Sequence, residues 1–174
     1  MVASGVTAVA AGACRACGFE LRYLENPANS GPARTQNRGI LASRAPIVLL
    51  IADDVWLAPG ALRSHLATHR LHPARETAVE GRVEQSPELT QTVFLRKWDP
   101  FRFGELDGLG ELPAYRFWAC NISFHREFVV EHGMFRHEKG RAGPSWLEDL
   151  ELGYRLKGHG MRLFYASCGG TERR

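Results

Sequence analysis

The chain has 174 residues and a formal net charge of +3, and 44% of its residues are hydrophobic and 24% charged. These values are typical of a globular protein with a sizeable core. Acidic and basic residues are mixed along the chain, which excludes a basic nucleic-acid-binding arm, and no apolar run approaches the ~20 residues that span a bilayer. The sequence therefore predicts a single domain over residues 1–174, with no nucleic-acid partner and no transmembrane segment.

The first half of the chain alternates between helical and strand-like patterns. The Ala-rich residues 3–17 predict a core helix rather than a secretory signal, because no basic residue opens them. Residues 19–24 alternate in polarity and predict a strand, and a Gly-Pro turn leads into a helix expected over residues 32–43. The β-branched run at residues 47–51 is typical of a central parallel strand, and a Pro-Gly pair begins a helix expected over residues 59–71.

The second half of the chain is less regular at its start. Residues 86–114 are rich in Gly, Pro and aromatic residues and predict a long surface segment, with a short helix near residues 89–97. The remaining strands are expected at residues 77–84, 119–124 and 162–165, and the remaining helices at residues 126–132 and 145–157. Strands that alternate with helices predict an α/β domain with a mainly parallel sheet.

Two adjacent carboxylates, Asp53 and Asp54, directly follow the apolar run in IVLLIADDVWLAPG. In open α/β sheets, ligands bind beyond the carboxyl ends of the strands, where this pair falls. Adjacent carboxylates repel each other, and a divalent cation removes the repulsion because Mg²⁺ and Mn²⁺ accept carboxylates together with water and substrate phosphate oxygens. The pair alone fits a metal site and a solvated acidic turn equally well.

A second acidic cluster opens the last predicted helix, in GPSWLEDLELGYRL. Ser145 and Glu148 have the spacing of a capping box, in which Glu148 would satisfy backbone N–H groups at the helix start. The box does not use Asp149, which shares a helix face with Leu152 and Leu156 and would lie beside apolar packing as a general base. The helix dipole alone also favours an acid in a first turn, and this is the simpler interpretation.

Three other patterns are weaker. The Gly-Pro turn within residues 29–39 feeds a helix start that could bind an anion, although such turns are usually only turns. His65, His69 and His72 recur on one helix face without the Glu of the H-E-x-x-H motif, so the sequence favours histidines on a helix surface. The C-x-x-C pair at residues 14–17 lacks the second pair that a zinc site needs.

Four segments, taken together, resemble the inverting family 2 glycosyltransferases of GT-A fold. They are GPARTQNRGILAS, IVLLIADDVWLAPGAL, WACNISFHREFVVEHGMF and WLEDLELGYRLKGHGMRLFY. In that order they are similar to the family's G-P-A helix, its Asp-rich metal motif, its N-x-S segment and its E-D-x-[ED]-L-G motif, over about residues 19–165. The resemblance implies a GT-A (Rossmann-like) α/β fold whose mainly parallel sheet is flanked by helices.

The resemblance also implies a reaction, the transfer of a sugar from a nucleotide-diphosphate sugar to an acceptor hydroxyl with inversion. Asp53 and Asp54 would form the diphosphate–metal site with Mn²⁺ or Mg²⁺, and Asp54 would be the direct ligand. Asp149 would be the catalytic base, with Glu148 beside it. The other implied positions are Gly31, Gln36 and Asn37 at the nucleotide sugar, and Asn121 and Ser123 near the donor or acceptor sugar.

Two departures from the family pattern concern the ends of the chain. Family members usually open with a strand, a helix and a second strand, all of which precede the start of this chain. They also usually have a metal-binding His after the last motif strand, and this chain has none there. We therefore expect a partial GT-A domain that lacks the first βαβ portion and is truncated at both ends. By analogy with other members of the family, we expect a role in polysaccharide biosynthesis with a glycan or lipid-linked acceptor. The same analogy suggests a cytoplasmic location with peripheral attachment to the membrane.

Two other classes of protein remain as alternatives. A truncated, non-catalytic glycosyltransferase-like module would keep the fold as a binding surface, or would have no activity. A phosphoacceptor signalling domain also places an acidic pair after a strand, but it needs a further Asp and a Lys at strand ends. Lys97, Lys139 and Lys157 are the only lysines, and none follows a predicted central strand, so we set this class aside.

Overall fold

A computed structural model describes residues 18, 20–84, 86, 92, 93, 97, 103–106, 108–136 and 147–166. The chain divides into two compact units, Met1–Ser30 and Gly31–Arg174. In the first unit, residues 20–30 are irregular, so the strand expected at residues 19–24 is wrong over its described part. Leu21 and Tyr23 are exposed, and no described strand pairs with this segment, so its alternating pattern has no sheet to join. The helix expected at residues 3–17, the C-x-x-C pair and most of residues 89–97 lie outside the described residues.

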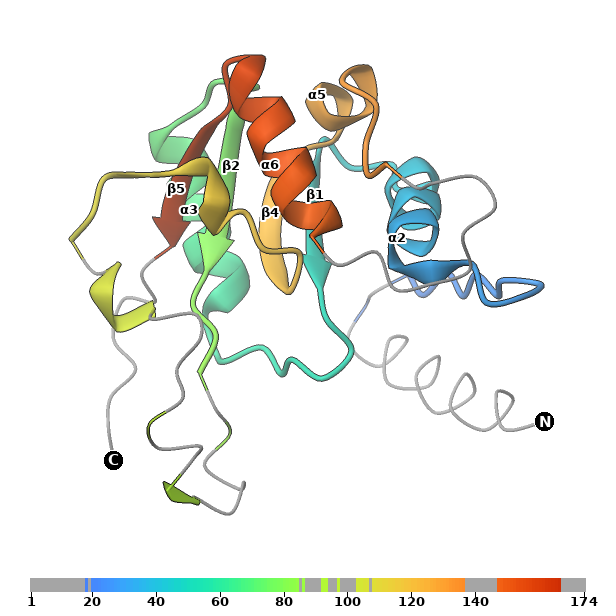
Figure 1. Cartoon of the computed structure of the whole chain (residues 1–174), viewed down its shortest axis with the longest axis horizontal. Coiled ribbons are helices and arrows are strands. Elements are labelled where there is room, and N and C mark those ends of the chain that lie inside the picture. Colours follow the sequence, from blue (N-terminus) through green and yellow to red (C-terminus); the bar gives the residue numbers. More distant parts are fainter. Residues whose placement is uncertain are drawn as a thin grey trace. The chain divides into compact units, whose positions relative to one another are not determined.

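A five-stranded mixed sheet organises the described part of the second unit (Figure 1). Its spatial order is β1 (Ile47–Ile51), β4 (Asn121–His125), β2 (Thr77–Gly81), β5 (Arg162–Ala166) and β3 (Glu111–Leu112). The α/β class is confirmed, but the expectation of a mainly parallel sheet is wrong for the strand pairs. Only β2 and β5 pair in parallel among the described strands, because β4 runs against both β1 and β2, and β3 runs against β5.

The connection from β2 to β4 is described in part. Its described residues form the short 3-10 turns η1 (Phe103–Glu105) and η2 (Ala114–Arg116) and the edge strand β3, and Val93 and Lys97 are helical. An antiparallel neighbour does not require the chain to cross back to the same end of the sheet, and β4 enters between β1 and β2 in this direction.

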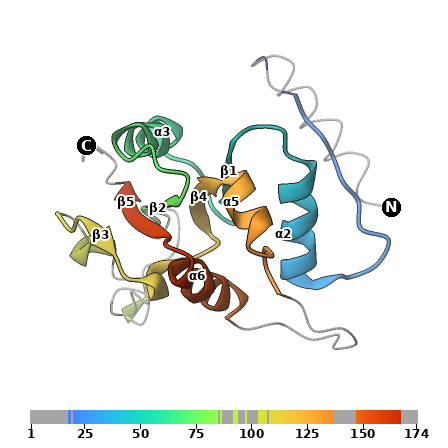
Figure 2. The same cartoon turned by 90° about the horizontal axis from the view of Figure 1, so that it is seen from above.

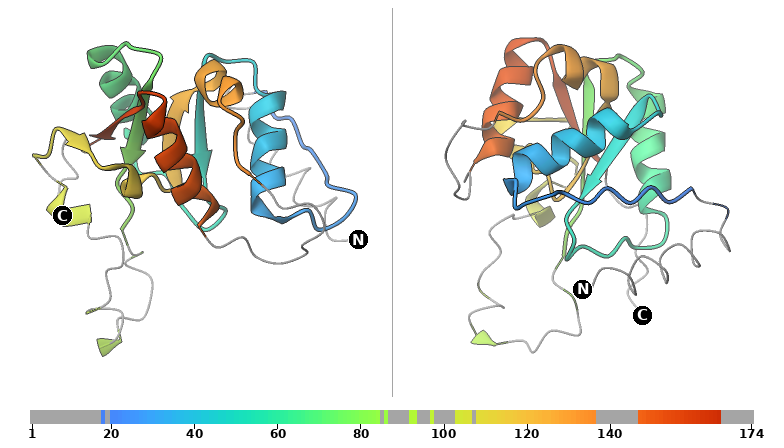
Figure 3. Two further views of the ribbon diagram at one scale, coloured as in Figure 1. Left: turned by 45° about the horizontal axis from the view of Figure 1, so that its top comes forward. Right: turned by 90° about the vertical axis from the view of Figure 1, so that its right-hand side faces the viewer.

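Helices cover both faces of the sheet, and Figures 2 and 3 show α3 on one side of the strands and α6 on the other. The described helices are α2 (Gly31–Ala42), α3 (Ala61–Leu71), α5 (Arg126–Glu131) and α6 (Glu148–Gly158). α3 packs on β2 and β5, α6 packs on η2, and α2 packs on α5. These helices confirm the predictions for this part of the chain, with bounds that differ by a few residues.

The start of α6 differs from the predicted capping box. The helix begins at Glu148, and the preceding Leu147 has a left-handed backbone with φ 87° and no side-chain cap. A capping box needs its Glu as the third residue of the helix. Glu148 is the first residue of α6, so the capping interpretation of Glu148 is wrong. The acids of the first turn instead lie where the helix dipole favours negative charge.

Side chains along β4 point alternately to the two sides of the sheet, which we call the α3 face and the α6 face after the helices that cover them. Ile122 and Phe124 point to the α6 face, where the Phe124 ring stacks on Phe117 with ring centroids 6.3 Å apart. Gly153 of α6 lies against the Phe117 side chain, since a Cβ at position 153 would be 2.6 Å from Phe117 Cβ and 2.7 Å from the Ala114 carbonyl oxygen. Glycine therefore lets the helix approach the sheet closely on this face.

Candidate active site

One edge of the sheet is fixed by hydrogen bonds between the end of β1, the start of β4 and the end of β2. The Ala52 N–H donates to the Cys120 carbonyl oxygen at 3.0 Å, where β1 ends and β4 begins. The Asn121 side chain donates from Nδ2 to the Arg82 carbonyl oxygen at 3.1 Å, just beyond β2. The turn that follows β1 is therefore held beside the first residue of β4.

Asp53 and Asp54 lie on this turn, and both are exposed. The Val55 N–H donates to the Ala52 carbonyl oxygen at 3.1 Å and closes the turn around them. No cluster of three or more His, Cys, Asp or Glu side chains that could hold a metal occurs within the described ranges. An exposed pair of carboxylates fits a Mg²⁺ or Mn²⁺ ion whose remaining ligands are water and substrate phosphate, rather than an ion enclosed by the protein.

The second acidic group is half-buried at the start of α6. Asp149 Oδ1 accepts the Leu150 N–H at 2.8 Å. Leu152 and Leu156, on the same helix face, are fully buried, so Asp149 lies beside apolar packing as the sequence predicts. Burial raises the pKa of the Glu148 carboxyl, and the charge of Asp149 acts in the same direction.

Glu80, in the interior of β2, is a buried acid that sequence reasoning missed. It pairs across the sheet with Ile122, faces α6 and is 0% exposed. Its Oε2 accepts the Trp118 N–H at 3.2 Å, whereas its Oε1 has no hydrogen-bond partner in the described part of the chain. Burial raises the pKa of Glu80 well above its usual range, and the charge of Asp149 raises it further. The sequence signal was an acid inside an apolar strand, a place where acids are rare.

Cys120 connects these groups to the edge of the sheet. Burial raises the pKa of its thiol to about 12, and the charges of Glu80 and Asp149 both contribute to the shift. Cys120 is bonded through its carbonyl oxygen to the turn that carries the acidic pair. The start of α6, which carries Asp149, lies at the end of the sheet where β1 ends (Figure 1).

Asn121 and Ser123 point to the other face and are buried against α3. Ser123 Oγ lies 2.8 Å from His65 Nδ1 and 2.9 Å from His69 Nε2, and Asn121 Oδ1 lies 3.2 Å from His65 Nε2. Both histidines are 4% exposed, so the prediction of surface histidines is wrong for this pair. The reason is that β4 presents polar side chains to α3, and these satisfy both ring nitrogens of His65 and the Nε2 of His69. The Nδ1 of His69 has no partner among the described residues.

The hydrogen bonds of this His–Ser–Asn network have one direction. Because Asn121 Nδ2 donates to the Arg82 carbonyl, Asn121 Oδ1 must accept from a protonated His65 Nε2. The Nδ1 of a neutral His65 then accepts the Ser123 O–H, and Ser123 Oγ accepts the Nε2–H of His69. Burial lowers the pKa of both histidines, that of His69 to about 4, which keeps the network in this neutral form.

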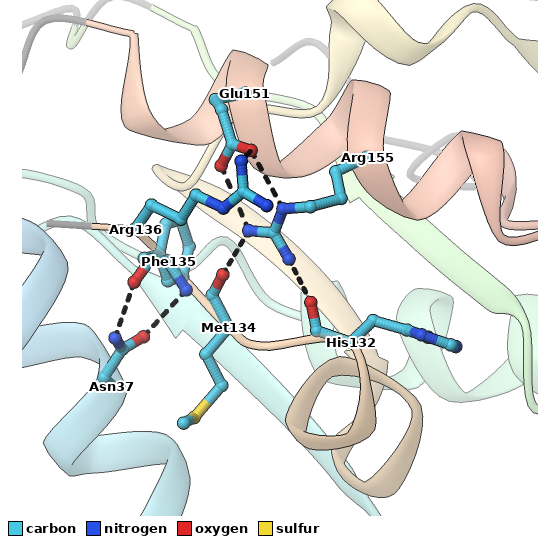
Figure 4. Close-up of polar contacts among 7 residues, drawn as sticks. All are labelled: Asn37, His132, Met134, Phe135, Arg136, Glu151 and Arg155. Carbon is cyan, nitrogen blue, oxygen red and sulfur yellow. Dashed lines mark hydrogen bonds and ion pairs between the residues drawn. The ribbon is translucent and has the colours of Figure 1, made fainter.

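Asn37, one of the predicted nucleotide-sugar residues on α2, holds the loop that follows α5. Asn37 Nδ2 donates to the Phe135 carbonyl oxygen at 2.8 Å, and Asn37 Oδ1 accepts the Phe135 N–H at 2.9 Å (Figure 4). From the other side, Arg155 donates to the carbonyl oxygens of His132 and Met134. The Asn37 amide is thus engaged in fixing the loop after α5, and any influence on a nucleotide passes through that loop.

The two neighbouring site residues differ from Asn37. Gly31 opens α2 with a left-handed φ of 73°, a conformation that favours glycine. Gln36 is half-buried, and its Oε1 has no hydrogen-bond partner among the residues described. This oxygen is itself buried, so the structure does not present it to a ligand.

Comparison with protein families identifies the class of the chain. The family model of glycosyl transferase family 2 matches residues 7–132, and the chain belongs to this family. The match includes Asp53, Asp54, Asn121 and Ser123. It ends before Asp149, so the prediction of Asp149 as a base rests on its place in the E-D motif alone. A search of curated proteins gives no match.

Membership indicates glycosyl transfer in general, with a nucleotide-sugar donor and a glycan acceptor, and members of the family often use divalent cations. The mixed sheet with helices on both faces is consistent with a GT-A-like fold. Within the described residues, no helix has the length and apolarity required to cross a membrane.

Proposed function

We propose that this chain is a metal-assisted, inverting glycosyltransferase that uses a nucleotide-diphosphate sugar. The observation that carries the proposal is the meeting of two kinds of carboxylate at one edge of the sheet. Asp53 and Asp54 are exposed on the turn that follows β1, and the half-buried Asp149 lies in the first turn of α6, which starts at the end of the sheet where β1 ends (Figure 1). Exposed carboxylates suit a hydrated cation, and a carboxylate beside apolar packing suits a base.

The proposed roles follow from these environments. Asp149 takes the proton of the acceptor hydroxyl as that oxygen attacks the anomeric carbon opposite the leaving group, and this attack inverts the centre. Asp54, as direct ligand, and Asp53 hold the cation, which when bound stabilises charge on the departing diphosphate. Glu148 shares the helix start with Asp149 and supports its orientation.

The remaining site residues have less direct roles in this proposal. Gly31, Gln36 and Asn37 shape the region around the nucleotide sugar, since the Gln36 oxygen is buried and the Asn37 amide is bonded to Phe135. Asn121 and Ser123 are buried, so they act on the sugar site by fixing the edge of the sheet. We further propose a cytoplasmic enzyme that acts on a glycan or lipid-linked acceptor at the membrane surface.

Calorimetric titration with UDP, GDP and dTDP, with and without Mn²⁺, tests the donor site. We expect Mn²⁺-dependent binding of one nucleotide that is lost in Asp54→Ala and kept in Asp149→Asn. Glu127→Gln, which removes an exposed carboxylate on α5, serves as the matched control and should bind normally. Absence of binding by a folded chain would overturn the proposal, and binding without turnover of any matching nucleotide sugar would favour the non-catalytic module.

A further inference from the structure

The short loop that follows α5, residues 132–136, has an unfavourable backbone conformation. Gly133 has a φ of 88°, and Met134, although it is not a glycine, has a left-handed φ of 53°. Such a conformation is disfavoured for a residue that carries a Cβ, and it persists only where the surrounding structure holds it. The contacts of this loop therefore have to compensate for its backbone strain.

The first set of contacts returns the loop to the helix before it. The backbone N–H groups of His132, Gly133 and Met134 donate to carbonyl oxygens of α5 at 3.2, 3.2 and 3.0 Å. These bonds end α5 and satisfy the donors of the loop. The carbonyl oxygens of the loop need partners from other elements.

Arg155 of α6 supplies two of these partners. Its guanidinium donates to the carbonyl oxygens of His132 and Met134 (Figure 4). Glu151, one turn earlier in α6, orients the guanidinium by accepting from Arg155 Nε at 2.8 Å and from Nη2 at 3.0 Å, and Arg136 of the loop also pairs with Glu151 at 3.2 Å. The Arg155 side chain is 12% exposed, so these charge-assisted bonds are shielded from water and are strong.

Asn37 of α2 holds the next residue of the loop. The Asn37 amide donates to the Phe135 carbonyl oxygen and accepts the Phe135 N–H, and Phe135 is 1% exposed. Both polar atoms of the amide are thus used on the loop, and neither is bonded to α6 in the part of the chain that the structure describes. The loop is therefore bonded on one side to the helix with the predicted nucleotide-sugar residues and on the other to the helix that carries Asp149.

We propose that the loop of residues 132–136 links α6 rigidly to α2, and that Arg155 is through this link a positioning residue for Asp149. The proposal rests on the proposed function for the identity of Asp149 as the base. Asp149 lies in the first turn of α6, less than two turns before Arg155, so a shift of α6 against the loop moves its carboxylate. A displacement of about 1 Å at a reacting group can cost about 10²-fold in rate.

Amide hydrogen exchange tests the link without requiring activity. The probe is the Glu151 amide, which bonds the Leu147 carbonyl oxygen at 3.0 Å at the start of α6. Asn37→Ala removes bonds to the loop only, so any effect on this probe passes through the loop. We expect the Glu151 amide to exchange at least about fivefold faster, because local opening of the loop then releases the start of α6. Faster exchange confined to the Phe135 amide would overturn the proposal.

Two controls separate this effect from a general loss of stability. Ser43→Ala removes a side-chain bond to the Gly39 carbonyl oxygen at the end of α2 and leaves the bonds of Asn37 in place. The Glu151 amide should keep its wild-type rate in this variant. The Arg162 amide, bonded to the Glu76 carbonyl oxygen at 3.0 Å, is the internal reference and should keep its rate in both variants. Acceleration of the Glu151 amide by Ser43→Ala, or equal acceleration of the Arg162 amide by Asn37→Ala, would count against the link.

Steady-state kinetics tests the positioning role where the chain turns over a nucleotide sugar. Arg155→Gln is expected to lower kcat about tenfold with the KM for the nucleotide sugar unchanged, because the base moves while the acidic pair and α2 lie outside α6. Arg155→Lys keeps the charge but lacks the planar fork that reaches both carbonyl oxygens, so it should restore little of kcat. Lys157→Gln, which removes a cation of the same helix from a surface ion pair with Glu111, is the matched control and should keep the wild-type kcat.

The outcomes of the kinetic test are distinct from those of the exchange test. An unchanged kcat in the folded Arg155 variants, full rescue by lysine, or a rise in KM equal to the fall in kcat would overturn the positioning role. If Arg155→Gln does not fold, Arg155→Lys carries the same comparison. Absence of turnover by the wild type would count against the proposed function alone, because amide exchange still decides the link.

Discussion

The two faces of the sheet bury polar side chains in opposite ways. On the α3 face, His65, Ser123 and Asn121 bond to one another in a directed chain that ends on a backbone carbonyl. On the α6 face, Glu80 is more deeply buried than either histidine but has one bonded oxygen and one without a described partner. Burial is therefore common to both faces, and each face keeps polar atoms without a described partner: His69 Nδ1 and His125 Nε2 on the α3 face, and Glu80 Oε1 on the α6 face. What separates the faces is the network that joins several side chains on the α3 face, whereas Glu80 is bonded only to one backbone N–H.

The comparison extends to pH. The histidines have folded pKa values below the unfolded value of 6.5, so the unfolded chain binds more protons and stability is lost as the pH falls from about 6.5 towards 4. Glu80 has a folded pKa above the unfolded value of 4.5, so the folded chain holds the extra proton. Its contribution is complete below pH 4.5 and is lost as the pH rises through the folded pKa.

The largest expected effect is on turnover and comes from replacing Asp149, the proposed base at the start of α6. Asp149→Asn removes the proposed base while keeping the size of the side chain. We expect kcat to fall by about 10²–10⁴-fold, the usual contribution of a positioned base, while Mn²⁺-dependent nucleotide binding survives. Steady-state kinetics and titration calorimetry measure the two quantities, and a variant with wild-type kcat would remove Asp149 from the mechanism.

The second largest effect is on stability and comes from removing the central hydroxyl of the His–Ser–Asn network on the α3 face. Ser123→Ala leaves His65 Nδ1 and His69 Nε2 without their common partner in a buried site. We expect a loss of about 2–3 kcal/mol in the free energy of unfolding, since unpartnered buried groups cost more than a lost exposed bond. Denaturant unfolding measures it, with Ser43→Ala as the control, because the Ser43 hydroxyl bonds the Gly39 carbonyl in an exposed position. Equal losses in the two variants would mean that burial of the network adds nothing.

A smaller effect sharpens the contrast in pH. The histidines make stability fall as the pH drops from about 6.5 towards 4, and Glu80 makes it fall as the pH rises from 4.5 towards its folded pKa. His69→Gln, which replaces the imidazole with a neutral amide, is expected to remove part of the first loss, and Glu80→Gln is expected to remove the second. Melting temperatures measured as a function of pH test it, and a single substitution that removed both losses would contradict the separation of the faces.

The smallest effect concerns a polar cluster on neither face. Glu111 accepts from Lys157 at 2.6 Å and from Arg162 at 2.9 Å on the surface of the protein. Glu111→Gln is expected to cost less than about 1 kcal/mol, and the loss should shrink at high salt because exposed ion pairs are screened. Denaturant unfolding at low and high salt measures it. A salt-independent loss as large as that of Ser123→Ala would show that this pair is not a solvated one.

The sequence predicts those features that depend on one segment at a time. The apolar run 47–51 gives β1 at its observed bounds, and the edge location of Asp53 and Asp54 follows from what comes directly after it. The burial of His65 could not be predicted in this way, because its partner Ser123 lies far along the chain on another strand. Glu80 was missed for the same reason, since Trp118 comes together with β2 only in the folded protein.

The antiparallel β4 has a consequence for how the protein folds. β1 and β2 do not touch each other in the sheet, and each gains its shared neighbour only when residues 121–125 insert between them. A one-residue slip of that strand would turn Ser123 towards the Phe117 side and Phe124 towards the histidines. Such a misaligned sheet would bury a hydroxyl among apolar side chains and is therefore disfavoured. Closing the centre of the sheet is therefore a long-range step that waits for most of the chain, and we expect it to limit the rate of refolding.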